Sequence, residues 1–206
     1  MKIIKTLLFG MLAASALIFN QANAQSSRGG LFVEPSVHYE SGESTINYPG
    51  LADSTGSSNG YGLGARLGFH MNEVLFAGID GRYSMIQFKD SASNQDSKSN
   101  AYNIGPVIGM QMPNLGLRLW GAYVVDGELN PEESQGYDVK FDDPTGPRLG
   151  AAFRVASLSL DVEYQQLKYS NSTLERAGAF APNATFDDVN LQNDSWIVSL
   201  SFPVEL

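Results

Sequence analysis

The sequence predicts an all-β protein: an eight-stranded antiparallel up-and-down transmembrane β-barrel with four long extracellular loops and three short periplasmic turns. Three observations predict it. Eight segments alternate with period two, their connections are alternately long and short, and one face of each segment carries no charged residue. Period-two alternation indicates a strand with two different faces. The segments are residues 30–40, 60–70, 73–88, 100–112, 115–126, 146–156, 158–169 and 195–204.

Residues 1–24 have the pattern of a secretory signal peptide. Two lysines within the first five residues precede an apolar run, and Ala22-Asn23-Ala24 forms a small-residue cleavage site. A positive n-region, an apolar h-region and such a site together direct export. The alternative is an N-terminal membrane anchor, which the short apolar run disfavours. We therefore expect a single mature domain, residues 25–206.

Composition excludes several classes of function. The chain of 206 residues has no cysteine, so disulfides, thiolate chemistry and cysteine metal sites are ruled out. Its formal net charge of −9 argues against nucleic acid as a partner, because phosphate backbones are bound by lysine and arginine. After the signal peptide, no run approaches the roughly 18 apolar residues of a transmembrane helix. Ordinary overall hydrophobicity is compatible with strands that alternate across a membrane.

Long and short connections alternate strictly along the chain. The short connections are "MN", "PN" and "AS", and the connections between them are long and polar. Among antiparallel neighbours, this order places the long loops at one end of the barrel and the short turns, with both termini, at the other. Bacterial outer-membrane barrels have this arrangement, with the short turns in the periplasm.

The uncharged face is predicted to contact lipid. Aromatic residues flank its aliphatic residues at both ends, as amphipathic rings do at membrane–water interfaces. The alternative is a soluble lipid-binding barrel with this face inside. Glycines on the opposite face favour the membrane barrel, because they make room in a crowded lumen. The predicted girdles are Tyr39, Tyr61, Tyr83, Tyr102, Tyr123, Tyr164 and Trp196 near the long loops, and Phe69, Phe153 and Phe202 near the short turns.

The charged face is predicted to fill the lumen. Isolated buried charges are costly, so its arginines and carboxylates should pair, for example Arg154 with Asp161. Eight strands leave little room for a pore, and the alternative is a selective polar conduit lined by the same charges. The predicted lumen charge network is Glu34, His38, Arg66, Asp80, Arg82, Arg118, Asp126, Arg148, Arg154, Asp161 and Glu163.

Three prolines, Pro35, Pro106 and Pro147, fall on the uncharged face of predicted strands. A closed barrel has no free edge, and proline has no N–H group to donate to a neighbouring strand. We therefore expect a bulge or a strand end near each of them.

The signal peptide, the eight alternating segments, the loop order and the C-terminal "SWIVSLSFPVEL" resemble small Gram-negative outer-membrane barrels. The resemblance covers residues 30–206 and includes the OmpX, OmpW and OmpA-barrel types and the broad outer membrane beta-barrel domain family. It implies a location in the cell outer membrane, a monomer, and contact with outer-membrane lipid, lipopolysaccharide and the assembly machinery. Such barrels commonly end on a phenylalanine that this machinery reads. Here "PVEL" follows Phe202, so the signal is displaced or replaced by Leu206.

The sequence offers little for catalysis. Lipid A deacylases and palmitoyltransferases resemble this architecture, and the deacylases use a serine and a histidine on the outer surface. The two histidines of this chain, His38 and His70, fall on the lumen face. Ser36 lies two residues from His38, but nothing else supports a nucleophile and base there. A hydrogen bond from a lumen histidine to Glu34 or Glu40 is the simpler interpretation. No phosphate loop or nucleotide fingerprint is present, and we expect no catalytic residue, cofactor or metal ion.

An acidic loop is the sharpest local feature. It either binds divalent cations, which bridge anionic lipopolysaccharide, or is a solvated loop that keeps the surface soluble. We expect a non-enzymatic integral outer-membrane protein whose narrow, charge-filled barrel displays acidic loops for an envelope or surface-interaction role. The alternatives are a narrow channel or transporter for small solutes and a lipid A-modifying enzyme. The acidic residues are Asp126, Glu128, Glu132, Glu133, Asp138, Asp142 and Asp143.

Overall fold

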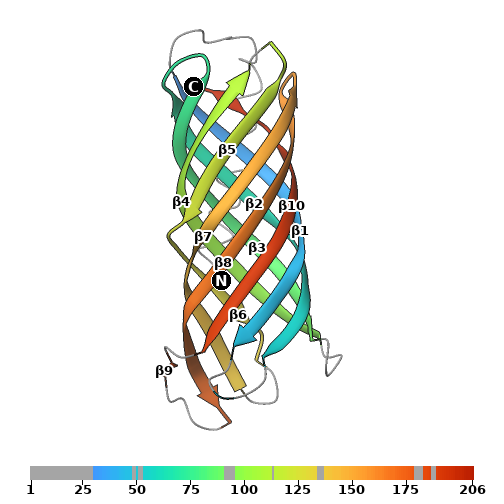
Figure 1. Ribbon diagram of the computed structural model, residues 1–206, viewed down its shortest axis with the longest axis vertical. Coiled ribbons are helices and arrows are strands. Elements are labelled where there is room, and N and C mark those ends of the chain that lie inside the picture. The colour runs from blue at the N-terminus through green and yellow to red at the C-terminus, as the bar shows by residue number, and fades with distance from the viewer. Residues whose placement is uncertain are drawn as a thin grey trace, which may run out of the picture.

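A computed structural model describes residues 30–47, 50, 53–90, 96–112, 114–133, 137–178, 183–186 and 189–206. The predicted signal peptide, residues 1–24, lies outside the described residues. The described chain forms one antiparallel sheet of eleven strands, which Figure 1 shows as a cylinder of tilted strands. None of the described residues belongs to a helix long and apolar enough to cross a membrane.

Eight wall strands make up the barrel. β5 and β6 are two parts of one wall strand, because both pair with β4 and with β7. β10 and β11 likewise both pair with β1, and β9 is a short addition to β8. The strands are β1 (Leu31–Asn47), β2 (Ser54–His70), β3 (Leu75–Asp90), β4 (Asp96–Met112), β5 (Leu117–Val124), β6 (Asp126–Pro131), β7 (Tyr137–Val155), β8 (Leu158–Ala177), β9 (Ala184–Phe186), β10 (Asn190–Ser201) and β11 (Val204–Glu205).

Each wall strand pairs with the next along the chain, and the last returns to the first. β10 pairs with β1 in a ladder that runs from Ser36 opposite Ser201 to Asn47 opposite Asn190. This last pairing closes the sheet, so no wall strand keeps a free edge. Closure satisfies backbone N–H and C=O groups within the wall, which is what allows strands to cross a hydrocarbon layer.

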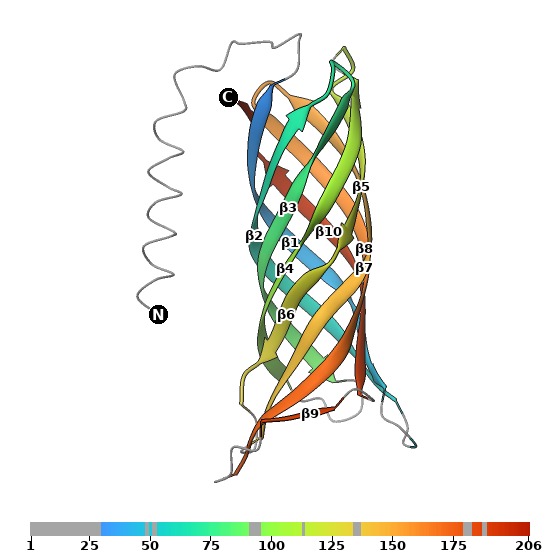
Figure 2. The ribbon, with the colours of Figure 1, turned by 90° about the vertical axis from the view of Figure 1, so that its left-hand side faces the viewer.

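The strands extend well past the predicted loop boundaries. Where the sequence predicted a loop over residues 41–59, β1 continues to Asn47 and β2 begins at Ser54. The C-terminus lies at the short-turn end in Figures 1 and 2, and β9 lies at the opposite end. The extensions of β1 and β2 escaped prediction because residues 41–47 and 54–59 carry almost no apolar side chain, so the apolar alternation stops there.

The wall strand formed by β5 and β6 contains a β-bulge opposite Pro106. Val107 pairs with Ala122, whereas Ile104 pairs with Asp126, so β5 and β6 have one more residue than β4 over this interval. The extra residue reverses which positions face inward, as bulges do. The prediction of a bulge at Pro106 is therefore confirmed.

The other two prolines also lie at interruptions. Pro35 lies between the residues that pair with β10 and those that pair with β11, and its carbonyl accepts the N–H of Phe202 at 2.9 Å. Pro147 falls in a gap of the ladder between β7 and β8. A missing donor at such a position costs no regular ladder bond.

Glycines on the inward face make room for large side chains. A Cβ atom added at Gly150 would lie 2.3 Å from Trp120 Cε2, a distance that real Cβ atoms do not reach. Trp120 is buried in the lumen. Gly81, in contrast, has no heavy atom within 4 Å of its would-be Cβ. Glycine is therefore required at position 150 for the packing of Trp120, whereas packing does not require glycine at position 81.

We predict that Gly150→Val lowers the free energy of unfolding by about 1–3 kcal/mol, because overpacking forces the Trp120 ring out of its place. Urea unfolding of the refolded protein in detergent measures this. The control is Gly81→Ala, which should leave the unfolding midpoint within experimental error. Equal effects of the two substitutions would contradict the packing role of Gly150.

Candidate functional site

A network of ion pairs fills the middle of the lumen, with the Asp80 carboxylate at its centre. This carboxylate accepts hydrogen bonds from Arg66 Nη2 at 3.1 Å, Arg82 Nε at 3.0 Å and Arg148 Nη1 at 2.6 Å. Arg82 Nη2 also donates to both oxygens of Glu163 at 2.6 Å. All five side chains are buried. An unpaired charge at this depth is strongly destabilising, so each side chain depends on the others.

The Glu34 carboxylate forms a second centre. Its Oε2 accepts hydrogen bonds from Arg118 Nη1 at 2.7 Å and Arg66 Nη1 at 3.4 Å, and its Oε1 accepts one from Ser201 Oγ at 2.7 Å. Arg66 therefore joins the Glu34 centre to the Asp80 centre. Hydrogen bonds between charged groups are stronger than neutral ones, so the joined centres hold opposite sides of the wall together.

Aromatic side chains close the lumen on the short-turn side of this network. Phe32 and Phe76 pack edge to face with ring centroids 5.8 Å apart, and both are buried with Trp120. The guanidinium of Arg118 lies 4.8 Å from the Phe76 ring centroid, and that of Arg66 lies 4.6 Å from the Trp120 ring centroid. These cation–π contacts join the aromatic layer to the ion network. The two phenylalanines were not predicted from the sequence, although both have the inward phase of their strands.

An apolar layer fills the interior on the long-loop side. This layer was not predicted from the sequence, because two of its members, Leu129 and Phe141, lie in the predicted acidic loop. In the sequence, this layer is indicated by the short stretches in which Leu129 and Phe141 alternate with charged residues. The layer consists of Ile86, Ala101, Val124, Leu129, Phe141, Leu167, Tyr169 and Leu191. The ion network is thus enclosed between an aromatic layer and an apolar layer.

The prediction that Asp126 faces the lumen is wrong. The bulge between β5 and β6 reverses the inward phase, so Val124 and Gly127 are buried while Asp126 is exposed. Its Oδ1 accepts a hydrogen bond from the N–H of Gly127 at 2.8 Å. A phase extended from β5 could not detect the inserted residue.

The predicted pair of Arg154 and Asp161 is also wrong. Arg154 Nε donates to the carbonyl of Ala156 at 3.0 Å, and its Nη1 lies 3.8 Å from Glu205 Oε1. Asp161 is buried and accepts a hydrogen bond from Ser159 Oγ at 2.7 Å. The Arg154 side chain points toward the turn between β7 and β8 and toward β11. About one-third of this side chain is exposed.

The two histidines have other partners than predicted. His38 Nε2 lies 2.9 Å from Ser84 Oγ, and neither Glu34 nor Glu40 is bonded to it among the described contacts. His70 Nε2 lies 3.3 Å from Glu205 Oε1. Both histidine side chains are buried in the interior.

Glu40 belongs to a polar cluster that the sequence analysis did not identify. Its Oε1 accepts hydrogen bonds from Gln165 Nε2 at 2.8 Å and from Ser195 Oγ at 2.7 Å. Gln165 Oε1 in turn accepts a hydrogen bond from Arg148 Nε at 3.3 Å. In the sequence, this cluster is indicated only by the inward phase of Gln165 and Ser195. Phase does not identify the hydrogen-bond partners of a residue.

The predicted girdle residues lie on the outer surface. Tyr61 is 68% exposed and Trp196 is 59% exposed, as expected of rings that meet lipid headgroups. Rings on neighbouring strands pack in tilted pairs: the centroids of Tyr39 and Tyr61 are 5.0 Å apart, and those of Tyr164 and Trp196 are 5.1 Å apart. The rings therefore form interstrand pairs around the outer girdle.

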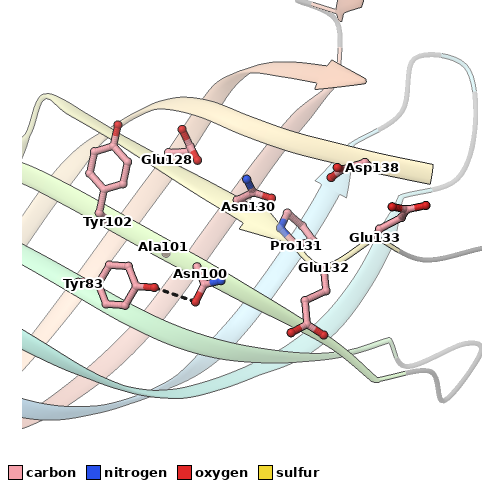
Figure 3. A pocket seen from close by; sticks show the side chains of 10 residues that line it. All are labelled: Tyr83, Asn100, Ala101, Tyr102, Glu128, Asn130, Pro131, Glu132, Glu133 and Asp138. Atoms are coloured by element: carbon pink, nitrogen blue, oxygen red, sulfur yellow. Dashed lines mark hydrogen bonds between the residues drawn. The ribbon is translucent and has the colours of Figure 1, made fainter. Parts of the chain in front are cut away.

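A groove of about 310 Å³ lies on the outer surface beside this girdle, across β3, β4 and β6, with Asp138 contributed by β7 (Figure 3). Tyr83 and Tyr102 line one part, and Tyr83 Oη donates to Asn100 Oδ1 at 2.9 Å. Apart from Ala101 and Pro131, the remaining lining is amide and carboxylate. The lining residues are Tyr83, Asn100, Ala101, Tyr102, Glu128, Asn130, Pro131, Glu132, Glu133 and Asp138.

Basic residues of the chain partly neutralise the acidic region. Lys140 Nζ lies 3.5 Å from Glu128 Oε2 and 3.3 Å from Asp142 Oδ1. Partial burial lowers the pKa of Lys140, but the hydrogen bond and charge of Asp142, with those of Glu128, outweigh burial and raise this pKa above its usual value. In the described part of the chain, no three histidine, aspartate or glutamate residues are arranged to hold a metal ion.

Comparison with known proteins identifies the family. Residues 9–202 match the outer membrane protein beta-barrel domain. The chain belongs to this family. The family places it in the outer membrane of a Gram-negative cell, as the sequence predicted. No curated protein matches the chain.

Several solved outer-membrane proteins are similar in structure. The outer membrane protein OprG from Pseudomonas aeruginosa is 11% identical, with a TM-score of 0.54 over 88% of this chain and 98% of that one. The attachment invasion locus protein Ail of Yersinia pestis is 16% identical, with a TM-score of 0.44 over 82% and 97%. Neisserial surface protein A is 13% identical, with a TM-score of 0.44 over 83% and 96%. At such identities the similarity to OprG shows the fold alone, and fold does not determine function.

We predict that Glu34→Gln lowers the free energy of unfolding by about 3–5 kcal/mol, because it leaves the buried guanidinium of Arg118 without its carboxylate. Replacing both residues, as Glu34→Gln with Arg118→Met, should recover part of the loss. Urea titration followed by tryptophan fluorescence measures both effects.

Glu133→Gln is the matched control for that substitution. Glu133 and Arg176 are both exposed, with their charged atoms 3.0 Å apart, and exposed pairs contribute about 0–1 kcal/mol. A loss for Glu34→Gln no larger than for Glu133→Gln would contradict the network as a stabilising core.

Proposed function

We propose that this protein is a non-enzymatic, closed outer-membrane barrel that acts through its outer surface. The single observation that carries the proposal is the stack of three layers across the lumen: aromatic, ionic and apolar. Each layer consists of buried side chains from several strands. A solute would have to displace all three layers to cross.

The burial of the arginines supports a filled lumen over a polar conduit. Arg148 is 1% exposed and Arg118 is 3% exposed, and both are bonded to acceptors of the wall. Arginines that line an aqueous path keep part of their guanidinium in water, because hydration replaces bonds that the protein does not supply. A narrow channel or transporter is the second candidate function. Conductance measurements distinguish it from a closed barrel.

The positions of the histidines support a non-enzymatic role. A hydrolase that uses a serine and a histidine needs the base within hydrogen-bond reach of a substrate-accessible nucleophile. The chain has two histidines, and both are buried inside the barrel. His38 Nε2 is next to Ser84 Oγ, and both side chains are enclosed in the lumen. A lipid substrate on the outer surface cannot reach them.

The partners of such a barrel follow from its exposed surfaces. The band between the girdles consists of exposed aliphatic residues such as Ile79, Ile108 and Leu149, which support contact with acyl chains. We include outer-membrane lipid, lipopolysaccharide and the assembly machinery among the proposed partners, with the chain acting as a monomer. The seam of β1 with β10 and β11 joins the first and last strands of the described chain and so closes the wall.

We predict that the purified protein in planar bilayers gives no stable conductance steps, because every layer of the lumen is packed. Removing only the aromatic layer, with Phe76→Ala and Trp120→Ala, should still give none, since the ion network remains. Removing the ion network as well, with Arg82→Ala and Arg148→Ala, should still give none, because the apolar layer remains. Current should pass only when that layer is opened too, by adding Phe141→Ala. Single-channel recording measures each variant, after heat-modifiable gel mobility has shown that it folds.

Arg154→Ala is the control, because Arg154 lies outside the three layers. It should behave as the unmodified protein in the same bilayers. Stable conductance steps of the unmodified protein that change with substitution of Arg118 or Arg148 would overturn the closed barrel and favour the channel.

A further inference from the structure

The groove on β3, β4 and β6 begins where the outer girdle ends. Tyr83 and Tyr102 are each 44% exposed and are members of that girdle. By strand register, Tyr102 pairs with Glu128 and Asn100 pairs with Asn130, one step further from the aliphatic band. The groove is therefore continuous with the lipid-contacting surface, and its polar part lies at the height of lipid headgroups.

The groove combines the groups that recognise hydroxylated rings. Carboxylates such as Glu132 accept hydrogen bonds from hydroxyl groups, and the amides of Asn100 and Asn130 supply both donors and acceptors. Asn100 Oδ1 already accepts from Tyr83, so its NH₂ group is the part left for a ligand. The faces of Tyr83 and Tyr102 suit the apolar C–H face of a sugar ring. Figure 3 shows these side chains gathered along one stretch of wall.

Two lysines lie on the same outer face, beyond the groove. Lys98 is two residues from Asn100 on β4, and Lys89 is on the adjacent β3; both are exposed. Gln87 pairs with Lys98, so Lys89 is the diagonal neighbour of Lys98 across the two strands. Diagonal neighbours lie about 7–8 Å apart, within reach of long side chains. The two ammonium groups are able to contact one phosphate.

We propose that this groove binds the phosphorylated saccharide headgroup of an outer-leaflet glycolipid, with its hydroxyl groups on Asn130 and Glu132 and its phosphate on Lys89 and Lys98. The acyl chains of the same lipid continue down the aliphatic band below Tyr83 and Tyr102. The inference rests on the part of the proposed function that assigns activity to the outer surface. It does not depend on the closed lumen, so conductance would leave it standing.

The separation of charges within the site explains how a phosphorylated ligand binds beside carboxylates. Glu132 and Asp138 have no ion-pair partner among the described residues, and they would repel a phosphate placed in the groove itself. Lys98 is the register neighbour of Glu132, because Ser99 pairs with Pro131 and the Glu132 N–H donates to the Lys98 carbonyl at 2.7 Å. Lys89 lies on β3, one strand further from β6. The ligand is therefore bound with its phosphate toward β3 and its hydroxyl donors toward β6.

The test measures binding of purified lipopolysaccharide to the full mature chain in neutral detergent, by native mass spectrometry. We expect Asn130→Ala with Glu132→Ala to weaken binding about tenfold, because two hydrogen-bonding groups are lost. Lys89→Gln with Lys98→Gln should weaken it and reduce its dependence on salt. Phosphatidylglycerol, an anionic lipid without a saccharide, should bind less tightly than lipopolysaccharide.

A matched control is available on the far side of the barrel. Gln192 and Asp194 on β10 are an exposed amide and carboxylate with the same spacing as Asn130 and Glu132. Gln192→Ala with Asp194→Ala should leave the affinity unchanged. Equal losses in the two double variants, or none in either, would overturn the proposal.

The deacylated saccharide separates a lipid headgroup from a free sugar. It should bind more weakly than the intact lipid and lose affinity in the same groove variant. Equal affinity of the deacylated and intact forms would overturn the assignment to a lipid. Binding of phosphatidylglycerol as tight as that of lipopolysaccharide would overturn the role of the saccharide.

Discussion

The structure depends on one carboxylate that is shared by three arginines. Asp80 binds Arg66, Arg82 and Arg148, which come from β2, β3 and β7. These guanidinium groups are buried, so none of them tolerates separation from its carboxylate. The wall must therefore bring strands that are distant in sequence to fixed positions around Asp80. The inward glycines that make room for long side chains, such as Gly150 beside Trp120, follow from the same requirement.

The aromatic and apolar layers make the ion network effective. A charge pair is stronger where water is excluded, and an exposed pair of the same geometry contributes little. Phe32, Phe76 and Trp120 exclude water on one side, and the cluster that contains Leu129 and Phe141 excludes it on the other. The two kinds of packing are interdependent: the apolar layers raise the cost of breaking an ion pair, and the ion pairs hold together the strands that carry the layers.

Much of the fold was predictable from the sequence, because membrane strands carry a strong alternating signal. The order of long and short connections, the girdles and the inward position of Asp80 and its arginines all follow from that phase. Individual partners do not. Phase alone could not tell that Arg154 would bond to Ala156 and approach Glu205, since geometry at a turn decides it. The strand extension beyond Glu40 was invisible for another reason: residues 41–47 carry almost no apolar side chain, which leaves no apolar alternation to detect.

The bulge opposite Pro106 links the closed lumen to the outer groove. Without the extra residue, the inward phase of Val124 would continue to Asp126 and Glu128, which would place two carboxylates in the upper lumen and Leu129 in the lipid or water outside. With it, Leu129 is buried in the apolar layer, and Glu128 faces the groove. β7 reverses its phase at the matching height, where Asp143 has a φ of 55°, and the pairing of Glu128 with Asp142 keeps the register set by β5. One inserted residue in the wall strand of β5 and β6, accompanied by a change of inward phase on β7, therefore seals the interior and turns the acidic side chains outward. The seal and the groove are consequences of the same local geometry, so a substitution that removes the bulge would disturb both together.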